Sequence, residues 1–232
     1  MGALIHRKGL ALALSALALL AACQFQPPVT TFAEQRLSWF SYLAAHDIQA
    51  ACTPGSPDHL RLVFNGGVDN RIRAYDLVAL PDGAALLAQR VDRGIEVSQF
   101  NVSEVLSLGA PVEAERRVAP ADHAQLRAAL AESGVFDPPP VGLTLRANDP
   151  YWLVSGCVDG AMLTTGFRDP SDAYRRLTFP PLLARLDTTG VPFFVTSRGA
   201  ADPIAGCSAN SERGGPADCQ AIRIGEDGLI GL

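Results

Sequence analysis

The sequence predicts an α+β fold in which antiparallel β-hairpins pack with three or four helices. Apolar runs of strand length flank an Asp-Gly pair at residues 82–83 and another at residues 159–160. Asp-Gly readily adopts the left-handed backbone of a tight hairpin turn. A segment with helical spacing begins between them at Pro120. Because hairpins and helices alternate without a steady βαβ rhythm, the expected sheets are antiparallel.

The first expected helix covers residues 32–48. Thr31 and Glu34 form a capping box, and the apolar residues that follow recur at helical spacing. Short strands are expected next, at residues 60–65 and 99–106, and between them a hairpin of residues 71–80 and 84–91. Asp82 and Gly83 are expected to supply the positive φ angles of its turn.

The second expected helix begins at Pro120 and ends near Gly134. Proline suits the first helical position, and glycine suits the position just beyond the last turn. Val135 would then contact Leu130 in a Schellman motif. The three prolines 138–140 that follow predict a rigid extended connection.

The clearest hairpin pairs residues 151–158 with residues 161–167 around Asp-Gly. Helical segments are expected at residues 171–178 and 181–187, interrupted by Pro180 and Pro181. The last expected elements are a strand at residues 191–197 and, within residues 221–232, a short strand with a turn at Asp227 and Gly228.

A cleaved signal peptide is expected at residues 1–22. Arg7 and Lys8 precede an apolar run from Gly9 to Ala22, in which Ser15 is the one polar side chain. A positive end, a short apolar run and a small-residue end are typical of a secretory signal peptide. The run is too short to span a bilayer core of about 30 Å comfortably.

Leu20, Ala21 and Ala22 stand directly before Cys23. These four residues match the lipobox, and the sequence here resembles the bacterial lipoproteins. The resemblance implies transfer of diacylglycerol to the Cys23 thiol, cleavage before Cys23 and N-acylation of the new amino terminus. Two or three acyl chains hold a protein firmly at a membrane. The alternative is an ordinary signal peptide with an incidental cysteine.

Residues 23–29 are expected to form a lipidated tether, and residues 30–232 a single envelope domain. The tether is polar and rich in proline, a composition that keeps a domain away from the lipid surface. In Gram-negative lipoproteins, an aspartate after the lipidated cysteine tends to retain the protein at the inner membrane. Gln24 occupies that position, which implies the outer membrane, facing the periplasm. In a Gram-positive cell the domain would lie outside the plasma membrane.

Four cysteines remain after Cys23, and an even number in an exported chain predicts two disulfides. Cys207 and Cys219 enclose a polar, glycine-rich segment without apolar periodicity, so we expect them to pair. Cys52 and Cys157 would then pair by elimination. No metal is expected, because the chain has no C-x-x-C motif and its histidines lack ligand spacing.

Composition excludes several classes of function. Without residues 1–22 the 19 basic residues become 17 against 24 acids, a net charge of −7. Nucleic-acid binding is therefore not expected, since it depends on clustered basic side chains. Lys8 is the only lysine, which removes P-loop nucleotide hydrolases, Schiff-base enzymes and S-x-x-K hydrolases. No cofactor and no nucleotide partner are expected.

No catalytic residue can be named from the sequence. The chain lacks G-x-S-x-G, and each mature histidine has an ordinary structural position. These histidines are His46, His59 and His123. The alternative function is a glycosidase-like envelope hydrolase with an acid pair near the central hairpin. Its candidate acids, each with a structural explanation of its own, are Asp149, Asp159, Asp169 and Asp172.

The favoured interpretation is a lipid-anchored, non-enzymatic binding or structural module of the cell envelope. Its partner would be an envelope protein or peptidoglycan. Tyr151 and Trp152 are the candidate binding surface, because exposed aromatic side chains often anchor recognition. The alternative is that Trp152 belongs to the core. The order of elements in residues 60–195 is also similar to several uncharacterised exported bacterial domains, a resemblance that implies architecture only.

Overall fold

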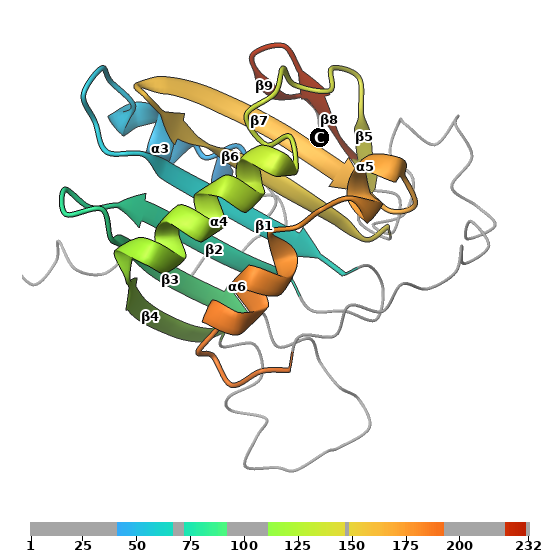
Figure 1. Cartoon of the computed structure of the whole chain (residues 1–232). Coiled ribbons are helices and arrows are strands. Elements are labelled where there is room, and N and C mark those ends of the chain that lie inside the picture. The colour runs from blue at the N-terminus through green and yellow to red at the C-terminus, as the bar shows by residue number, and fades with distance from the viewer. Residues whose placement is uncertain (1–40, 67–71, 92–110, 147–148, 193–220, 231–232) are drawn as a thin grey trace, which may run out of the picture. The chain divides into compact units, whose positions relative to one another are not determined.

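The computed structural model describes residues 41–66, 72–91, 111–146, 149–192 and 221–230, all within a unit that starts at Phe40. These residues form a six-stranded sheet in the order β4-β3-β2-β1-β6-β7 and a three-stranded sheet in the order β5-β8-β9 (Figure 1). Every strand pair is antiparallel. The α+β class with antiparallel hairpins is therefore confirmed.

The strands of the large sheet are β1 His59–Asn65, β2 Arg73–Ala79, β3 Ala85–Val91, β4 Val112–Val118, β6 Tyr151–Val158 and β7 Ala161–Arg168. The small sheet contains β5 Thr144–Arg146, β8 Ala221–Gly225 and β9 Gly228–Ile230. The helices are α3 His46–Ala51, α4 Pro120–Glu132, α5 Asp172–Arg175 and α6 Pro180–Leu186. Residues 41–43 are also helical, so the described part of the chain has five helical segments, where three or four were expected.

The main core lies between the large sheet and helices α4 and α6, which cover one face of that sheet (Figure 1). Trp152 lies in this core, with its ring centroid 5.0 Å from Phe64 and 5.0 Å from Phe179. Alternate residues of each strand point to this face because the side-chain period of a strand is two. The interior positions of the helices are Leu126, Ala129, Leu130, Leu183 and Leu186.

Helix α4 ends as the sequence predicts. Gly134 has a φ of 79°, which a side chain rarely adopts. Its N–H donates to the carbonyl of Ala131 at 2.9 Å, and the N–H of Val135 donates to the carbonyl of Leu130 at 3.0 Å. These two bonds make a Schellman motif and satisfy carbonyls that the helix leaves free.

The expected turn of the β6–β7 hairpin is confirmed, since Asp159 and Gly160 have φ angles of 52° and 75°. The prediction for the β2–β3 turn is half wrong. Gly83 has a φ of 82°, but Asp82 does not have a positive φ. The Asp82 carboxylate instead accepts hydrogen bonds from the N–H of Ala84 and from Arg117, so the side chain fixes this turn.

The continuous helix expected to reach residue 48 is interrupted, because Ala45 has a left-handed φ of 54° between residues 41–43 and α3. Helix continuation would occupy the carbonyls of Tyr42 and Leu43 with N–H groups four residues on. They accept instead from Arg61 Nη1 at 3.0 Å and from Ser155 Oγ at 3.2 Å. Buried side chains of the sheet therefore stabilise the break. Residues 32–40 lie outside the described part.

Other predictions differ in detail. The tail hairpin is confirmed as β8 and β9, and α5 and α6 replace the two helical segments expected near residues 171–187. Strands β4 and β5 were not expected. Residues 191–192 are not in a strand, and the expected strands at 99–106 and from 193 onward lie outside the described residues.

Candidate functional site

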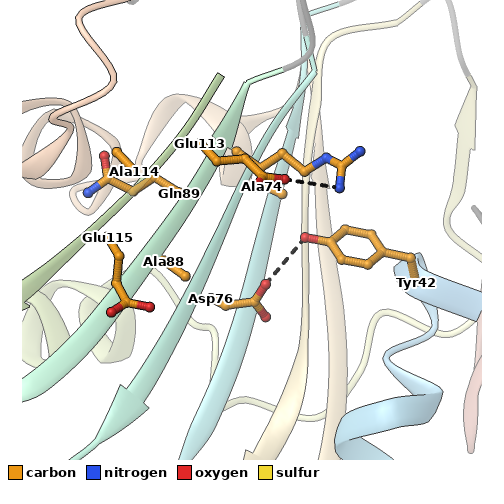
Figure 2. A pocket seen from close by; sticks show the side chains of 9 residues that line it. Tyr42, Ala74, Asp76, Ala88, Gln89, Glu113, Ala114 and Glu115 are labelled. Carbon is orange, nitrogen blue, oxygen red and sulfur yellow. Dashed lines mark hydrogen bonds and ion pairs between the residues drawn. The ribbon is translucent and has the colours of Figure 1, made fainter. Parts of the chain in front are cut away.

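The face of the large sheet opposite α4 contains a hollow of about 430 Å³ (Figure 2). It lies over β2, β3 and β4, and Tyr42 reaches it from the residues before α3. Its lining includes Tyr42, Ala74, Asp76, Ala88, Glu113 and Glu115.

The hollow exists because small side chains alternate with charged ones on this face. Ala74 and Ala88 occupy neighbouring strands and leave space above the sheet. Ala88 pairs with Asp76 on one side and with Glu115 on the other, so two carboxylates flank one alanine in a single row. Strands in a sheet lie about 4.8 Å apart, so the two acidic Cα atoms are about 10 Å apart.

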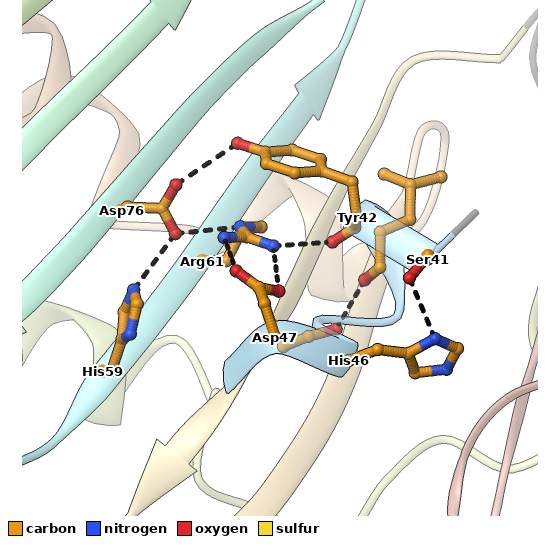
Figure 3. Close-up of polar contacts among 9 residues, drawn as sticks. Ser41, Tyr42, His46, Asp47, His59, Arg61 and Asp76 are labelled. Carbon is orange, nitrogen blue, oxygen red and sulfur yellow. Dashed lines mark hydrogen bonds and ion pairs between the residues drawn. The ribbon is translucent and has the colours of Figure 1, made fainter. Parts of the chain in front are cut away.

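Asp76 is held in place by three neighbours (Figure 3). Its Oδ1 accepts from Arg61 Nε at 2.8 Å and lies 3.2 Å from His59 Nε2. Its Oδ2 accepts from the hydroxyl of Tyr42 at 3.3 Å. The carboxylate therefore presents a fixed negative wall to the hollow.

Arg61 is the centre of this network, although only 4% of the residue is exposed. Its Nη1 and Nη2 donate to the two oxygens of Asp47, both at 2.8 Å, and its guanidinium lies 3.9 Å from the centroid of the Tyr42 ring. A buried charge is tolerated only when it is paired and hydrogen-bonded. The hydrogen bond from Arg61 also lowers the pKa of Asp47 below its ordinary value.

Tyr42 is neutral at ordinary pH. Burial, together with the negative charge of Asp76, raises the pKa of Tyr42 well above that of a free phenol. A neutral phenol donates its proton in the bond to Asp76 and presents the ring to the hollow. Tyr42 therefore lines the hollow as a hydrogen-bond donor and does not act as a base.

The far side of the hollow is acidic as well. Glu113 lies 3.4 Å from Arg90 in an exposed ion pair, and Glu115 has no ion-pair partner among the described residues. Arg61, which pairs with Asp76, also pairs with Asp47, and Arg90 pairs with Glu113. With Glu115 included, four carboxylates stand against two arginines, a difference of −2. This arrangement favours cationic groups. Among the residues that the structure describes, no serine, cysteine or histidine lines the hollow, so the described lining offers no such nucleophile for acyl transfer.

The prediction that Tyr151 and Trp152 form a binding surface is wrong, because they are 6% and 2% exposed. Trp152 faces the core beneath α6, and Tyr151 is on the opposite side of β6, where burial raises its pKa to about 12. A strand that is buried on both faces gives a continuous apolar run, and YWLV in β6 is such a run.

The four candidate acids of a glycosidase do not meet as one group. Asp159 occupies the turn of the β6–β7 hairpin, whereas Asp149 and Asp169 lie at the other end of the same strands. The eight residues of β6 extend for about 26 Å. Asp172 forms an exposed ion pair with Arg175.

His46, His59 and His123 have separate partners. His46 Nδ1 lies 3.1 Å from Ser41 Oγ, and His123 Nδ1 lies 2.9 Å from the carbonyl oxygen of Gly83. His59 belongs to the Asp76 network. The described residues contain no cluster of three metal-ligating side chains.

One predicted disulfide is present, since Cys52 is bonded to Cys157 with a Cα–Cα distance of 5.6 Å. It joins the end of α3 to β6. Cys23, Cys207 and Cys219 lie outside the described residues. In the described part of the chain, no helix has the length and apolar character needed to cross a bilayer.

Sequence reasoning missed the hollow because its residues are spread from Tyr42 to Glu115 without a local motif. One signal was available: Arg61 interrupts the apolar strand HLRLVFN, and a charge at such a position requires a buried partner. No family model, curated protein or solved structure matches this chain.

Proposed function

We propose that this protein is a lipid-anchored cell-envelope protein whose α+β domain binds a basic segment of another envelope protein. The anchor is supported by the lipobox residues 20–23 after a signal peptide. The binding site is the hollow over β2, β3 and β4. The observation that carries the proposal is the row of Asp76 and Glu115 on either side of Ala88.

The fixed position of Asp76 supports binding, because the wall of the hollow opposite Glu115 needs no rearrangement when a ligand enters. Arg61, His59 and Tyr42 already orient the carboxylate. Groups that are preorganised lose less conformational entropy when a ligand binds. Glu115, which no described side chain neutralises, is then available to a lysine or arginine of the partner.

The hollow is better suited to a peptide segment than to a small molecule, because a small-molecule ligand is normally enclosed in a deep pocket. The hollow is shallow, with exposed Glu113 and Glu115 at its rim. Charges at a rim mainly raise the association rate and make binding sensitive to salt. We therefore expect binding that weakens as ionic strength rises.

The test uses the full-length protein in detergent micelles and three fluorescent probes: an arginine-rich peptide, its glutamate-rich counterpart and a soluble peptidoglycan fragment. We expect the basic peptide to bind and the acidic peptide not to bind. Glu115→Gln should weaken binding about two- to fivefold, the range of an exposed charge pair. Asp172→Asn is the matched control, because Asp172 is an exposed acid that pairs with Arg175.

Two results would contradict the proposal. If Glu115→Gln and Asp172→Asn weaken binding equally, the hollow is not the site. If the peptidoglycan fragment binds and the basic peptide does not, the partner is the cell wall. Neither result depends on whether Cys23 is lipidated.

A further inference from the structure

Strand β4 is an edge of the large sheet. It pairs with β3 along all seven of its residues. Its other side has no strand partner among the residues that the structure describes, since β4 ends the strand order. An edge of this kind presents free N–H and C=O groups that can pair with another strand.

The side chains of β4 divide between the two faces of the sheet. Glu113, Glu115 and Arg117 point to the face with the hollow, because they alternate with residues of the helix-covered face. The helix-covered face carries Val112, Ala114, Arg116 and Val118. On the hollow face, Glu113 thus lies in the first half of the strand, Glu115 lies at its centre and Arg117 lies near its end.

The charges on β4 match those of a second copy of β4 that runs antiparallel to it. If two copies of β4 pair antiparallel about Glu115, then Glu113 of each copy lies opposite Arg117 of the other. Val112 lies opposite Val118, and Ala114 lies opposite Arg116. The only like-charged pair is Glu115 with the partner's Glu115. Opposite charges on directly facing strand positions stabilise a sheet, whereas like charges destabilise it.

We propose that β4 is a homodimer interface, in which it pairs with β4 of a second copy about a two-fold axis at Glu115. The two six-stranded sheets would join into one sheet of twelve strands. A two-fold axis gives both copies the same contacts, as most homodimers require. The added strand is an instance of β-augmentation.

Other registers fit less well. A slip by one residue would place each side chain on the wrong face. A two-fold axis at Arg116 also makes two pairs of Glu115 with Arg117. It pairs only five residues of the strand, however, and places Arg116 opposite itself. An axis at Ala114 sets Glu113 opposite the partner's Glu115, twice. The axis at Glu115 uses all seven residues and makes two favourable charge pairs.

Charged residues on an edge strand ordinarily keep other strands away. On β4 they select for a second copy, because the signs match across the two-fold axis. Dimerisation would also bring the partner's Arg117 beside Glu113 at the rim of the hollow. The inference does not rest on the proposed function, since it needs neither a ligand nor an anchor.

A crosslinking experiment on the full-length protein in cells tests the register. Residues directly opposite in an antiparallel pair have Cα atoms about 4.5–5.5 Å apart, which is within the range that a disulfide spans. Glu115→Cys should therefore form a disulfide-linked dimer on a non-reducing gel. Glu113→Cys and Arg117→Cys should each stay monomeric alone and crosslink when they are expressed together. The wild-type chain is the control for the native cysteines.

A charge-reversal experiment tests the same pairs without new thiols. Glu113→Arg and Arg117→Glu should each abolish co-purification of two differently tagged copies. Mixing the two variants should restore it, because each arginine then faces a glutamate. Arg175→Glu is the matched control, as Arg175 is an exposed base on α5. The proposal is overturned if Glu115→Cys remains monomeric or if the mixture behaves like the single variants.

Discussion

Arg73 and Asp187 form an ion pair that is almost fully buried, with Nη1 of Arg73 2.7 Å from Oδ2 of Asp187 and side chains 4% and 6% exposed. The same Oδ2 accepts from the hydroxyl of Tyr75 at 2.8 Å. Arg73 also donates to the carbonyls of Val191 and Pro192. The pair therefore fastens the residues after α6 to strand β2.

Replacing Asp187 by alanine should lower the free energy of unfolding by about 3–5 kcal/mol, because a buried site would lose both the ion pair with Arg73 and the hydrogen bond from Tyr75. Urea denaturation measures the change. The control is Asp172→Ala, whose side chain is 76% exposed and pairs with Arg175. This control should lower the free energy of unfolding by less than about 1 kcal/mol. Equal losses would show that burial of the pair is unimportant.

The tyrosines predict how stability depends on pH. Burial is the largest cause that raises the pKa of each of the chain's four tyrosines, to about 12 for Tyr151 and Tyr174 and further for Tyr42 and Tyr75. An unfolded tyrosine ionises near pH 10. Above that pH the unfolded chain releases protons that the folded chain retains, so stability should fall as pH rises from about 10 to 12. Below pH 10 the contribution of the protonated tyrosines to the free energy of unfolding is fully present.

Absorbance at 295 nm follows the tyrosines directly. In the folded protein the midpoint of ionisation should lie well above pH 10, whereas in urea it should return to about 10. A midpoint near 10 while the circular dichroism spectrum stays native would contradict the burial of these phenols.

The disulfide Cys52–Cys157 closes a loop with a sequence separation of 105. Its removal in the double variant Cys52→Ala, Cys157→Ala should lower the free energy of unfolding by about 4–5 kcal/mol. Urea denaturation of the reduced wild type should give a loss at least as large, because reduction would also open the predicted pair Cys207–Cys219. A peptide map under non-reducing conditions should show this pair, and it also tests the predicted pair Cys207–Cys219.

Alanine substitutions at two glycines distinguish the effect of backbone strain from the effect of steric crowding by a new Cβ. Gly160 and Gly142 have φ angles of 75° and 89°, so alanine is strained at both. At Gly160 the new Cβ would also lie 2.7 Å from Cα of Pro54, whereas at Gly142 it meets nothing within 4 Å. We expect Gly142→Ala to lower the free energy of unfolding by about 1 kcal/mol, and Gly160→Ala to lower it by about 1–3 kcal/mol more. Urea denaturation measures both changes. Equal costs would mean that the Pro54 segment moves away freely.

The proposed anchor predicts the behaviour of Cys23→Ser. The wild type should fractionate with membranes and incorporate labelled fatty acid, because an acylated thiol binds the bilayer. Cys23→Ser should lose the label and leave the membrane fraction. A variant that stays with membranes, combined with a wild type that never takes up label, would disprove the anchor.

Features with a local cause were predictable from the sequence. The Schellman end of α4 depends on Gly134 and its immediate neighbours, and the β6–β7 turn depends on Asp159 and Gly160. In each case the residue itself determines which backbone angles are accessible, because glycine and, less often, aspartate adopt a positive φ. Tertiary context did not have to be known.

Features with distant causes were not predictable. The helix break at Ala45 depends on Arg61 and Ser155, which become its neighbours only when the sheet forms. Strand β4 was missed because four of its seven residues are charged, so its sequence carries little apolar signal. Without β4 the sheet had no known edge, so Asp76 and Glu115 could not be placed in one row.

The attachment of residues 42–52 determines how the domain carries a mechanical load. Arg61 fastens this segment to β1, and Ser155 and the disulfide Cys52–Cys157 fasten it to β6. Both are interior strands, paired on each side. A pull on the chain at Ser41 therefore acts on the middle of the sheet, partly through a covalent bond, and cannot peel an edge strand away one hydrogen bond at a time. The domain should resist tension applied from its N-terminal side.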